Sequence, residues 1–238
     1  MTGEFDLSRL QEQHLYDGLG EGLRFGEELR LAGPAGVIEA VISYPAAPAE
    51  VFAVVIICHP HPLYGGSMTN KVVHTLSESF NDMGMLTLRF NFRGVGRSEG
   101  QFDHGKGEAD DLLALSRWLR ERYAGAPLWL AGFSFGAYVV LRAQPEVMAQ
   151  RLLLVAPPVS MFDFDRLAPV AVPWMVVQGA HDEIIDCQAV ADWVQRQRVR
   201  PVFRLMVDAD HFFHGRTNRL RRAVESGWRR LSGGREAQ

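Results

Sequence analysis

The chain has 238 residues, 47% of them hydrophobic and 22% charged, which suits one compact domain with a large buried core. Its net charge of −3 and pI near 6.2 give no electrostatic reason to expect nucleic acid as a partner. It contains no run of 18 uncharged apolar residues, and its acidic start is unlike a signal peptide. We therefore expect a cytoplasmic protein that has no membrane partner.

The first 25 residues lack sustained periodicity and carry glycines at positions 18, 20 and 22. They are predicted to form a loose N-terminal arm or a short accessory helix, and residues 26–238 are predicted to form the folded domain. From Glu27 onward, short β-branched runs alternate with amphipathic segments of helix length. This alternation predicts an α/β domain, with a mostly parallel sheet covered by helices on both faces.

Eight segments have the length and composition of strands. They are residues 27–31, 37–43, 53–58, 86–90, 128–131, 152–155, 174–178 and 202–207. The third shows no polar alternation, which favours a central parallel strand buried on both faces. The first two are close enough in the chain to pair as an antiparallel edge. The two cysteines, Cys58 and Cys187, fit neither a disulfide framework nor a zinc cluster, so we expect structural thiols.

Five segments between these strands have helical periodicity, at residues 71–83, 108–123, 135–144, 188–199 and 217–231. Pro145 is expected to end the third helix. The stretch between Val155 and Pro173 is only about 17 residues long and contains three prolines. It is predicted to be a loop, because it is too short to form a separate lid domain.

The pentapeptide Gly132-Phe-Ser-Phe-Gly136 lies between a predicted strand and a predicted helix. A serine in such a turn points away from the sheet, and the flanking glycines let the backbone pack closely. The helix N-terminus that follows favours the negative charge of acyl transfer. The pattern alone is weak, because serine is also a favoured helix N-cap. Its context favours Ser134 as a nucleophile.

A serine nucleophile needs a base, and the base needs a carboxylate that orients it. In folds where the serine lies in a turn between a strand and a helix, the acid follows the serine in the chain, and the histidine follows the acid. Asp182 comes just after the seventh predicted strand, where a catalytic acid would be presented. Glu183 and Asp186 are its rivals.

His211 follows the eighth predicted strand and precedes the last helix, which makes it the better candidate for the base. His181 is the direct neighbour of Asp182 and is expected to point elsewhere. His214 is interpreted as a histidine on the surface or behind the site. Ser134, Asp182 and His211 thus follow three successive suitable strands in the expected order.

The segment His59-Pro-His-Pro-Leu-Tyr-Gly-Gly66 follows the third predicted strand, a position that can supply one backbone N–H to an oxyanion hole. The prolines have no N–H, which leaves His61 as first choice and Leu63 as second. The N–H of Phe135 would complete the pair. A His-x-His pair can also bind a metal, but no Asp, His or Cys cluster lies nearby. We expect neither a metal nor a cofactor.

These motifs together resemble a family of small, lidless bacterial α/β-hydrolases. The resemblance rests on the loop at residues 59–66 and on residues 89–98, 128–137, 155–158 and 211–215, and it spans roughly residues 26–231. It implies an α/β-hydrolase fold with an eight-stranded sheet and no lid, and a triad of Ser134, Asp182 and His211. The first 25 residues have no counterpart in the family core, and Ala180 stands where many relatives carry an additional Asp.

The expected activity is cleavage of a small carboxylic ester or thioester through an acyl-enzyme intermediate. A non-catalytic binding protein with the same fold is the alternative, and a metallohydrolase is a third class. The sequence does not define the oligomeric state. Candidate pocket walls are Phe92, Phe102, Met161, Phe162 and Phe212.

Overall fold

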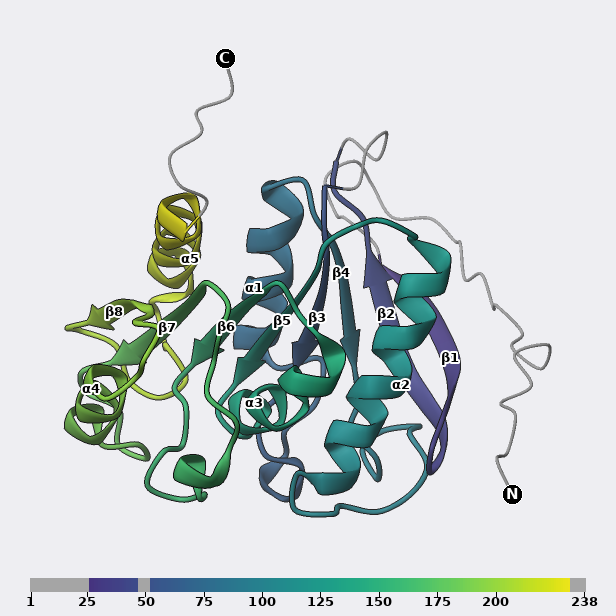
Figure 1. Cartoon of the computed structure of the whole chain (residues 1–238), viewed down its shortest axis with the longest axis horizontal. Helices are drawn as coiled ribbons and strands as arrows, with labels where there is room; N and C mark the ends of the chain where they lie inside the picture. Colours follow the sequence, from purple (N-terminus) through teal and green to yellow (C-terminus); the bar gives the residue numbers. More distant parts are fainter. Residues whose placement is uncertain (1–25, 47–51, 232–238) are drawn as a thin grey trace.

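The computed structural model describes residues 26–46 and 52–231 (Figure 1). The predicted N-terminal arm, residues 1–25, lies outside the described residues. One sheet contains eight strands. In chain order they are β1 (Glu27–Gly33), β2 (Gly36–Ser43), β3 (Val54–Cys58), β4 (Leu86–Phe90), β5 (Leu128–Phe133), β6 (Arg151–Val155), β7 (Trp174–Gly179) and β8 (Val202–Met206).

The strands lie side by side in the order β1-β2-β4-β3-β5-β6-β7-β8. From β4 to β8 all neighbours are parallel, whereas β1 pairs with β2, and β2 with β4, in antiparallel fashion. The predicted antiparallel edge is confirmed. The chain places β4 on one side of β3 and β5 on the other. Parallel sheets bind ligands at such a reversal, in the crevice at the carboxyl ends of the strands.

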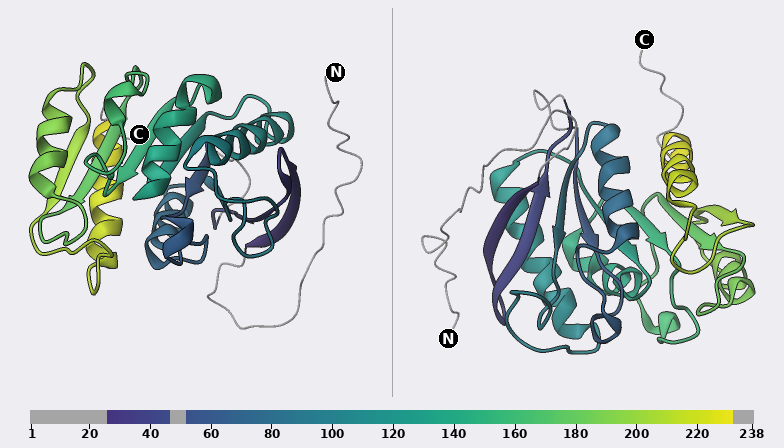
Figure 2. Two further views of the ribbon diagram at one scale, coloured as in Figure 1. Left: turned by 90° about the horizontal axis from the view of Figure 1, so that it is seen from below. Right: turned by 180° about the vertical axis from the view of Figure 1, so that it is seen from behind.

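Five helices cover the two faces of the sheet (Figure 2). They are α1 (Lys71–Asp82), α2 (Lys106–Arg122), α3 (Phe135–Val147), α4 (Cys187–Gln195) and α5 (Thr217–Leu231). Val54 and Ile56 of β3 pack in the core beneath α2, α3 and α4, while Val55 and Ile57 pack beneath α1 and α5. Both faces of β3 are therefore buried, which explains its uninterrupted apolar composition.

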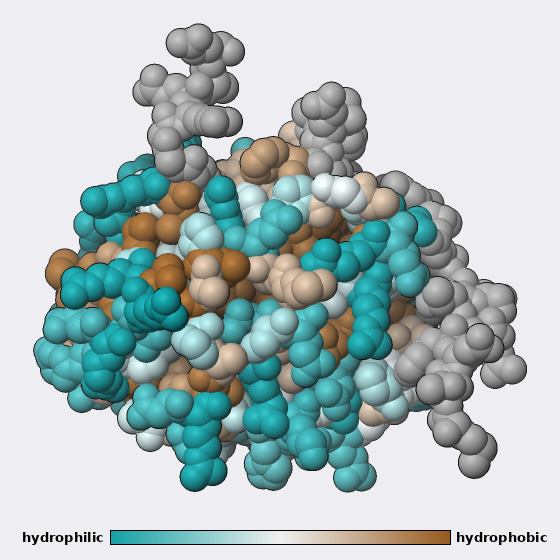
Figure 3. Space-filling model, in the orientation of Figure 1, coloured by the Kyte–Doolittle hydropathy of each residue, from teal (hydrophilic) through white to brown (hydrophobic). Residues whose placement is uncertain are grey.

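The surface over α2, α3 and α4 is mainly hydrophilic, with apolar side chains in small groups between (Figure 3). None of the described helices is long and apolar enough to cross a membrane. Residues 156–173, which join β6 to β7, contain one short 3-10 helix, Phe164–Arg166, and form no lid domain. The predicted α/β-hydrolase fold without a lid is confirmed.

The predicted end of the third helix at Pro145 is wrong, because α3 continues through Pro145 to Val147. A proline removes one helical hydrogen bond, and in the last turn there is little helix left to disrupt. Met148 caps the end of the helix, with a left-handed φ of 50° and its N–H donated to the carbonyl of Gln144.

The fourth helix is shorter than predicted, ending at Gln195 instead of residue 199. The carbonyl of Val199 accepts a hydrogen bond of 2.7 Å from the indole nitrogen of Trp174 in β7. This contact joins the segment after α4 to the sheet. It depends on tertiary structure, so helical periodicity does not reveal it.

Candidate active site

Ser134 is the single residue between the end of β5 at Phe133 and the start of α3 at Phe135. Its φ of 54° and ψ of −118° are rare for a residue with a side chain, and such strain is concentrated at functional sites. Ser134 occupies the N-cap position, yet its side chain makes no capping hydrogen bond. Helix capping therefore does not account for a serine at this position.

The glycines that flank Ser134 allow close backbone contacts. A Cβ at Gly132 would lie 2.3 Å from the carbonyl oxygen of Gly136, and a Cβ at Gly136 would lie 2.3 Å from the carbonyl oxygen of Cys58. Both contacts are too short for any other residue without a backbone shift. The turn that carries Ser134 is thus packed directly against the end of β3, where the His59 to Gly66 loop begins.

Asp182 and His211 form a buried pair, in the loops that follow β7 and β8. His211 Nδ1 lies 2.9 Å from Asp182 Oδ2, and the side chains are 3% and 0% exposed. The other carboxylate oxygen accepts hydrogen bonds from the amides of Ile184 and Ile185, at 3.0 and 2.7 Å. Because Nδ1 donates to the carboxylate, Nε2 of the neutral ring is left as an acceptor.

The environment of Asp182 favours its charged form. Burial by itself would raise the pKa of this carboxyl, but the hydrogen bonds from His211 and from the amides of Ile185 and Ile184 outweigh burial and lower it. The carboxylate is thus ionised at neutral pH and can stabilise a protonated imidazole.

The rival acids have other contacts. Glu183 accepts a hydrogen bond of 3.3 Å from the backbone N–H of His211, and its contact is therefore with the main chain of that residue. Asp186 caps α4 by accepting a hydrogen bond of 2.9 Å from the amide of Gln188. Of the three acids, Asp182 is the one paired with the His211 ring.

The rival histidines lie on the surface. His181 is exposed, and its backbone N–H donates to the carbonyl of Ala209. The His214 side chain is 72% exposed and its Nδ1 lies 2.8 Å from Asp210 Oδ2. Of the three histidines that follow Ser134 in the chain, His211 is the one that lines the pocket together with Ser134.

The loop after β3 lines the same pocket as Ser134. The N–H of Leu63 donates to His61 Nδ1 at 3.3 Å, so the second-choice oxyanion donor is already engaged. No such hydrogen bond from the His61 N–H is found among the described residues. The N–H of Phe135 is the first in α3 and has no acceptor within the helix. His61 and Phe135 remain the two candidate donors.

The His61 ring packs against three aromatic rings, those of Tyr64, Phe102 and Phe135, with centroids 4.7, 4.9 and 4.9 Å away. Burial, together with repulsion from His104, lowers the pKa of His61. The ring is therefore neutral at pH 7, and its Nδ1 accepts the Leu63 N–H.

His59 has a structural environment. Its Nε2 accepts the N–H of Phe92 at 3.0 Å and its Nδ1 lies 2.6 Å from the carbonyl oxygen of Pro60, so both ring nitrogens have protein partners. Burial lowers the pKa of His59 to about 3. Within residues 26–46 and 52–231, no group of three or more His, Cys, Asp or Glu is arranged to hold a metal ion. The His-x-His pair is thus not a ready-made metal site.

The pocket has a volume of about 380 Å³ and is mainly apolar. Its lining comprises Pro60, His61, Tyr64, Gly65, Gly66, Asn70, Ser134, Phe135, Pro158, Met161, Phe162, Ile184, His211 and Phe212. Of the predicted walls, Met161, Phe162 and Phe212 line it. Phe92 is instead buried in the core behind Phe135.

Two polar residues near the site, Asn70 and Gln178, were not singled out by the motifs. Asn70 lines the pocket at the start of α1, and asparagine before an amphipathic run is a recognisable N-cap. Gln178 contacts Asp182 from β7. It ends an apolar run and has no local pattern that would reveal this contact.

The order of the sheet, the strained serine between β5 and α3 and the open crevice define an α/β hydrolase. Residues 49–164 match the family model for serine aminopeptidase, S33. This match includes Ser134 and ends before Asp182 and His211.

Three relatives extend this likeness to most of the chain. XC6422 from Xanthomonas campestris, an α/β serine hydrolase without a lid, is 43% identical, with 88% of this chain and 96% of that chain covered and a TM-score of 0.83. An α/β serine hydrolase homologue from Coxiella burnetii is 41% identical, with coverages of 87% and 99% and a TM-score of 0.81. An uncharacterized protein of Rickettsia prowazekii (strain Madrid E) is 37% identical over 204 residues, 81% of this chain and 84% of the relative. The chain belongs to the lidless α/β serine hydrolases.

Proposed function

We propose that this serine hydrolase cleaves small carboxylic esters or thioesters through an acyl-enzyme intermediate on Ser134. The observation that carries the proposal is the buried hydrogen bond of 2.9 Å between His211 Nδ1 and Asp182 Oδ2, at a pocket that Ser134 and His211 both line. A nucleophile, a base and an orienting carboxylate are the parts that acyl transfer requires.

In the first half of the reaction, Nε2 of His211 takes the proton of the Ser134 hydroxyl while Oγ attacks the carbonyl carbon. Asp182 stabilises the imidazolium that forms. The backbone N–H groups of Phe135 and His61 donate to the oxyanion of the tetrahedral intermediate. The imidazolium then protonates the departing alcohol or thiol, and the acyl group stays on Ser134.

In the second half, water replaces the leaving group. His211 takes a proton from this water, which attacks the acyl carbon, and the same two N–H groups stabilise the second oxyanion. Collapse of this intermediate releases the carboxylic acid and returns the proton to Ser134. The cycle uses no cofactor.

The lining of the pocket favours neutral esters over peptides with a free N-terminus. An aminopeptidase has to bind the α-ammonium group of its substrate, and a buried cation needs a partner of opposite charge. Among the described residues that line the pocket, none carries a carboxylate. An apolar acyl group matches the aromatic and aliphatic side chains that are present.

The test is hydrolysis of p-nitrophenyl esters, from acetate to longer acyl chains, by the wild type, Ser134→Ala and the exposed control Ser160→Ala. Labelling by a fluorophosphonate is located by mass spectrometry, and acyl thioesters and amino-acid p-nitroanilides are assayed in parallel. We expect label on Ser134, and loss of hydrolysis by up to about a million-fold in Ser134→Ala alone. A folded wild type that neither reacts nor labels would favour the binding-protein alternative.

A further inference from the structure

Asn70 is a polar side chain in the pocket that the proposed reaction does not use. It lines the pocket at the N-terminus of α1, and its Oδ1 accepts a hydrogen bond of 2.9 Å from the backbone N–H of Val72. This bond caps the helix. Only the oxygen of the amide can accept from an N–H, so the contact also fixes which end of the amide group faces the helix.

The other end of the amide, Nδ2, carries two N–H groups. No hydrogen bond from it to another described residue is found, although the side chain lies in the pocket lining. Serine, threonine or aspartate would cap the helix about as well. Aspartate lacks a donor, and the hydroxyl of serine or threonine ends closer to the main chain, so what asparagine adds at this position is an N–H donor that reaches beyond the cap.

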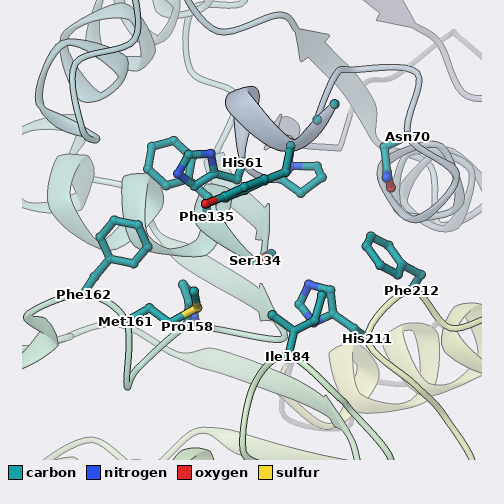
Figure 4. A pocket seen from close by; sticks show the side chains of 14 residues that line it. His61, Asn70, Ser134, Phe135, Pro158, Met161, Phe162, Ile184, His211 and Phe212 are labelled. Atoms are coloured by element: carbon teal, nitrogen blue, oxygen red, sulfur yellow. The ribbon is translucent and has the colours of Figure 1, made fainter.

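The position of Asn70 relative to Ser134 indicates which part of a substrate it meets. In Figure 4, Pro158, Met161 and Phe162 lie on one side of Ser134, whereas His211, Phe212 and Asn70 lie on the other. In acyl transfer the imidazolium protonates the leaving group, so the leaving group lies on the side of the histidine. The acyl group then extends toward Phe162 and Met161.

We propose that Asn70 recognises the leaving group, by donating a hydrogen bond from Nδ2 to an acceptor that lies beyond the scissile oxygen or sulfur. The inference rests on the proposed ester or thioester hydrolysis and assigns its substrate class. This class has an apolar acyl group and an alcohol or thiol that bears a carbonyl, ether or hydroxyl oxygen. The Asn70 side chain takes part in no covalent step and affects only substrate specificity.

The test compares two hexanoate esters, of 2-methoxyethanol and of 1-butanol, whose leaving groups have the same number of heavy atoms and differ by one acceptor oxygen. The quantity measured is the ratio of their kcat/KM values. Differences in intrinsic reactivity between the esters cancel when this ratio is compared between wild type and variant.

Asn70→Ser keeps a capping oxygen and replaces the Nδ2 donor with a shorter hydroxyl. We expect this variant to lower the methoxyethyl-to-butyl ratio by about 2- to 12-fold, the range that one neutral hydrogen bond supplies. Asn70→Asp also keeps the cap and replaces the donor with a carboxylate oxygen, so it should lower the ratio at least as far. The Tm should stay near wild type in both variants and fall in Asn70→Ala, which lacks a cap.

An unchanged ratio in Asn70→Ser would overturn the assignment, as would a wild type that hydrolyses p-nitrophenyl hexanoate and neither alkyl ester. A ratio that falls only in variants whose Tm also falls would show that Asn70 acts through the helix cap. This result would also overturn the assignment. Failure of the proposed function looks different, because no ester would then be cleaved and Ser134 would not react with a fluorophosphonate.

Discussion

Gln178 donates a hydrogen bond from Nε2 to Asp182 Oδ2 at 2.9 Å, the same oxygen that lies 2.9 Å from His211 Nδ1. Gln178 is fully buried, and its Oε1 has no hydrogen-bond partner among the described residues. A buried amide with one unpaired end is costly. Its contact with Asp182 holds the carboxylate in place and favours its charged form.

Replacement of Gln178 by methionine should alter the pH dependence of stability more than it alters the stability at pH 7. Loss of a hydrogen bond to a charged group costs about 1.5–3 kcal/mol, and removal of the unpartnered oxygen recovers about 1–3 kcal/mol. The two effects offset each other, so the free energy of unfolding at pH 7 should change by about 2 kcal/mol or less. The lowered pKa of Asp182 stabilises the fold above about pH 4, and this contribution is lost as the pH falls through the folded-state pKa.

Without the Gln178 donor the pKa of Asp182 should move back toward its ordinary value, so Gln178→Met should lose less stability on acidification than the wild type. Urea unfolding at pH 7 and pH 3 measures this difference. Asp182→Asn is the matched control, because it lacks the titrating group. A larger acid loss in Gln178→Met than in the wild type would contradict the prediction.

The backbone of Ser134 predicts a stability difference between two variants at this position. A left-handed φ of 54° with ψ of −118° costs a residue with a Cβ about 1–3 kcal/mol, and glycine avoids this cost. Glycine also lowers the stability of the folded state by about 0.4–1 kcal/mol, because it gives the unfolded chain greater freedom. Ser134→Gly should therefore be about 0.5–2 kcal/mol more stable than Ser134→Ala in chemical denaturation. Equal stabilities would show that the turn is not strained.

Gly136 should be sensitive to substitution by alanine for a steric reason. The new Cβ would lie 2.3 Å from the carbonyl oxygen of Cys58 and 2.7 Å from that of His59. We expect a loss of stability of about 1–3 kcal/mol or more, and slower fluorophosphonate labelling, because the turn has to move away from the loop that carries His61.

Gly84→Ala is the control for Gly136→Ala. Gly84 also has a backbone that favours glycine, with φ of 85°, but no atom lies within 4 Å of its Cβ position, and it does not line the pocket. Its stability should fall by about 1–2 kcal/mol while the labelling rate stays at the wild-type value. Equal labelling rates in the two variants would argue against close packing as the reason for Gly136.

His59 should make the fold sensitive to mild acid. Because burial lowers its pKa from an ordinary value near 6.5 to about 3, the stabilising contribution of neutral His59 is complete above pH 6.5 and is lost as the pH falls toward 3. Between pH 6.5 and pH 5 this group should remove about 2 kcal/mol of unfolding free energy. His59→Gln should lack this part of the pH dependence, and the exposed His74→Gln should retain it. An unchanged slope in His59→Gln would refute the assignment.

The positions of the strands could be predicted from the sequence because burial of a central strand affects consecutive residues. Val54 to Cys58 are apolar without interruption, and that pattern needs no knowledge of the neighbouring strands. The helix ends were less predictable. Pro145 lies inside α3, and α4 stops where Val199 meets Trp174, a contact between distant parts of the chain.

Much of the candidate site could also be predicted, because parallel strands present their following loops at one edge of the sheet. That rule was enough to associate Ser134, Asp182 and His211, whose chain order matches the fold. The two rivals of Asp182 could not be removed in this way. Glu183 contacts the backbone of His211 and Asp186 caps α4, which only the folded geometry reveals.

The sequence alone thus specified the α/β architecture, because hydrophobic periodicity and turn composition are local properties. The order of residues in the chain also grouped Ser134, Asp182 and His211 as one candidate site. Tertiary structure decided the contacts of Gln178 with Asp182, the engagement of the Leu63 N–H by His61, and the position of Asn70 opposite the apolar wall. Each is a directional hydrogen bond or a position across a cavity. Such features depend on backbone and side-chain geometry that residue type and spacing do not encode.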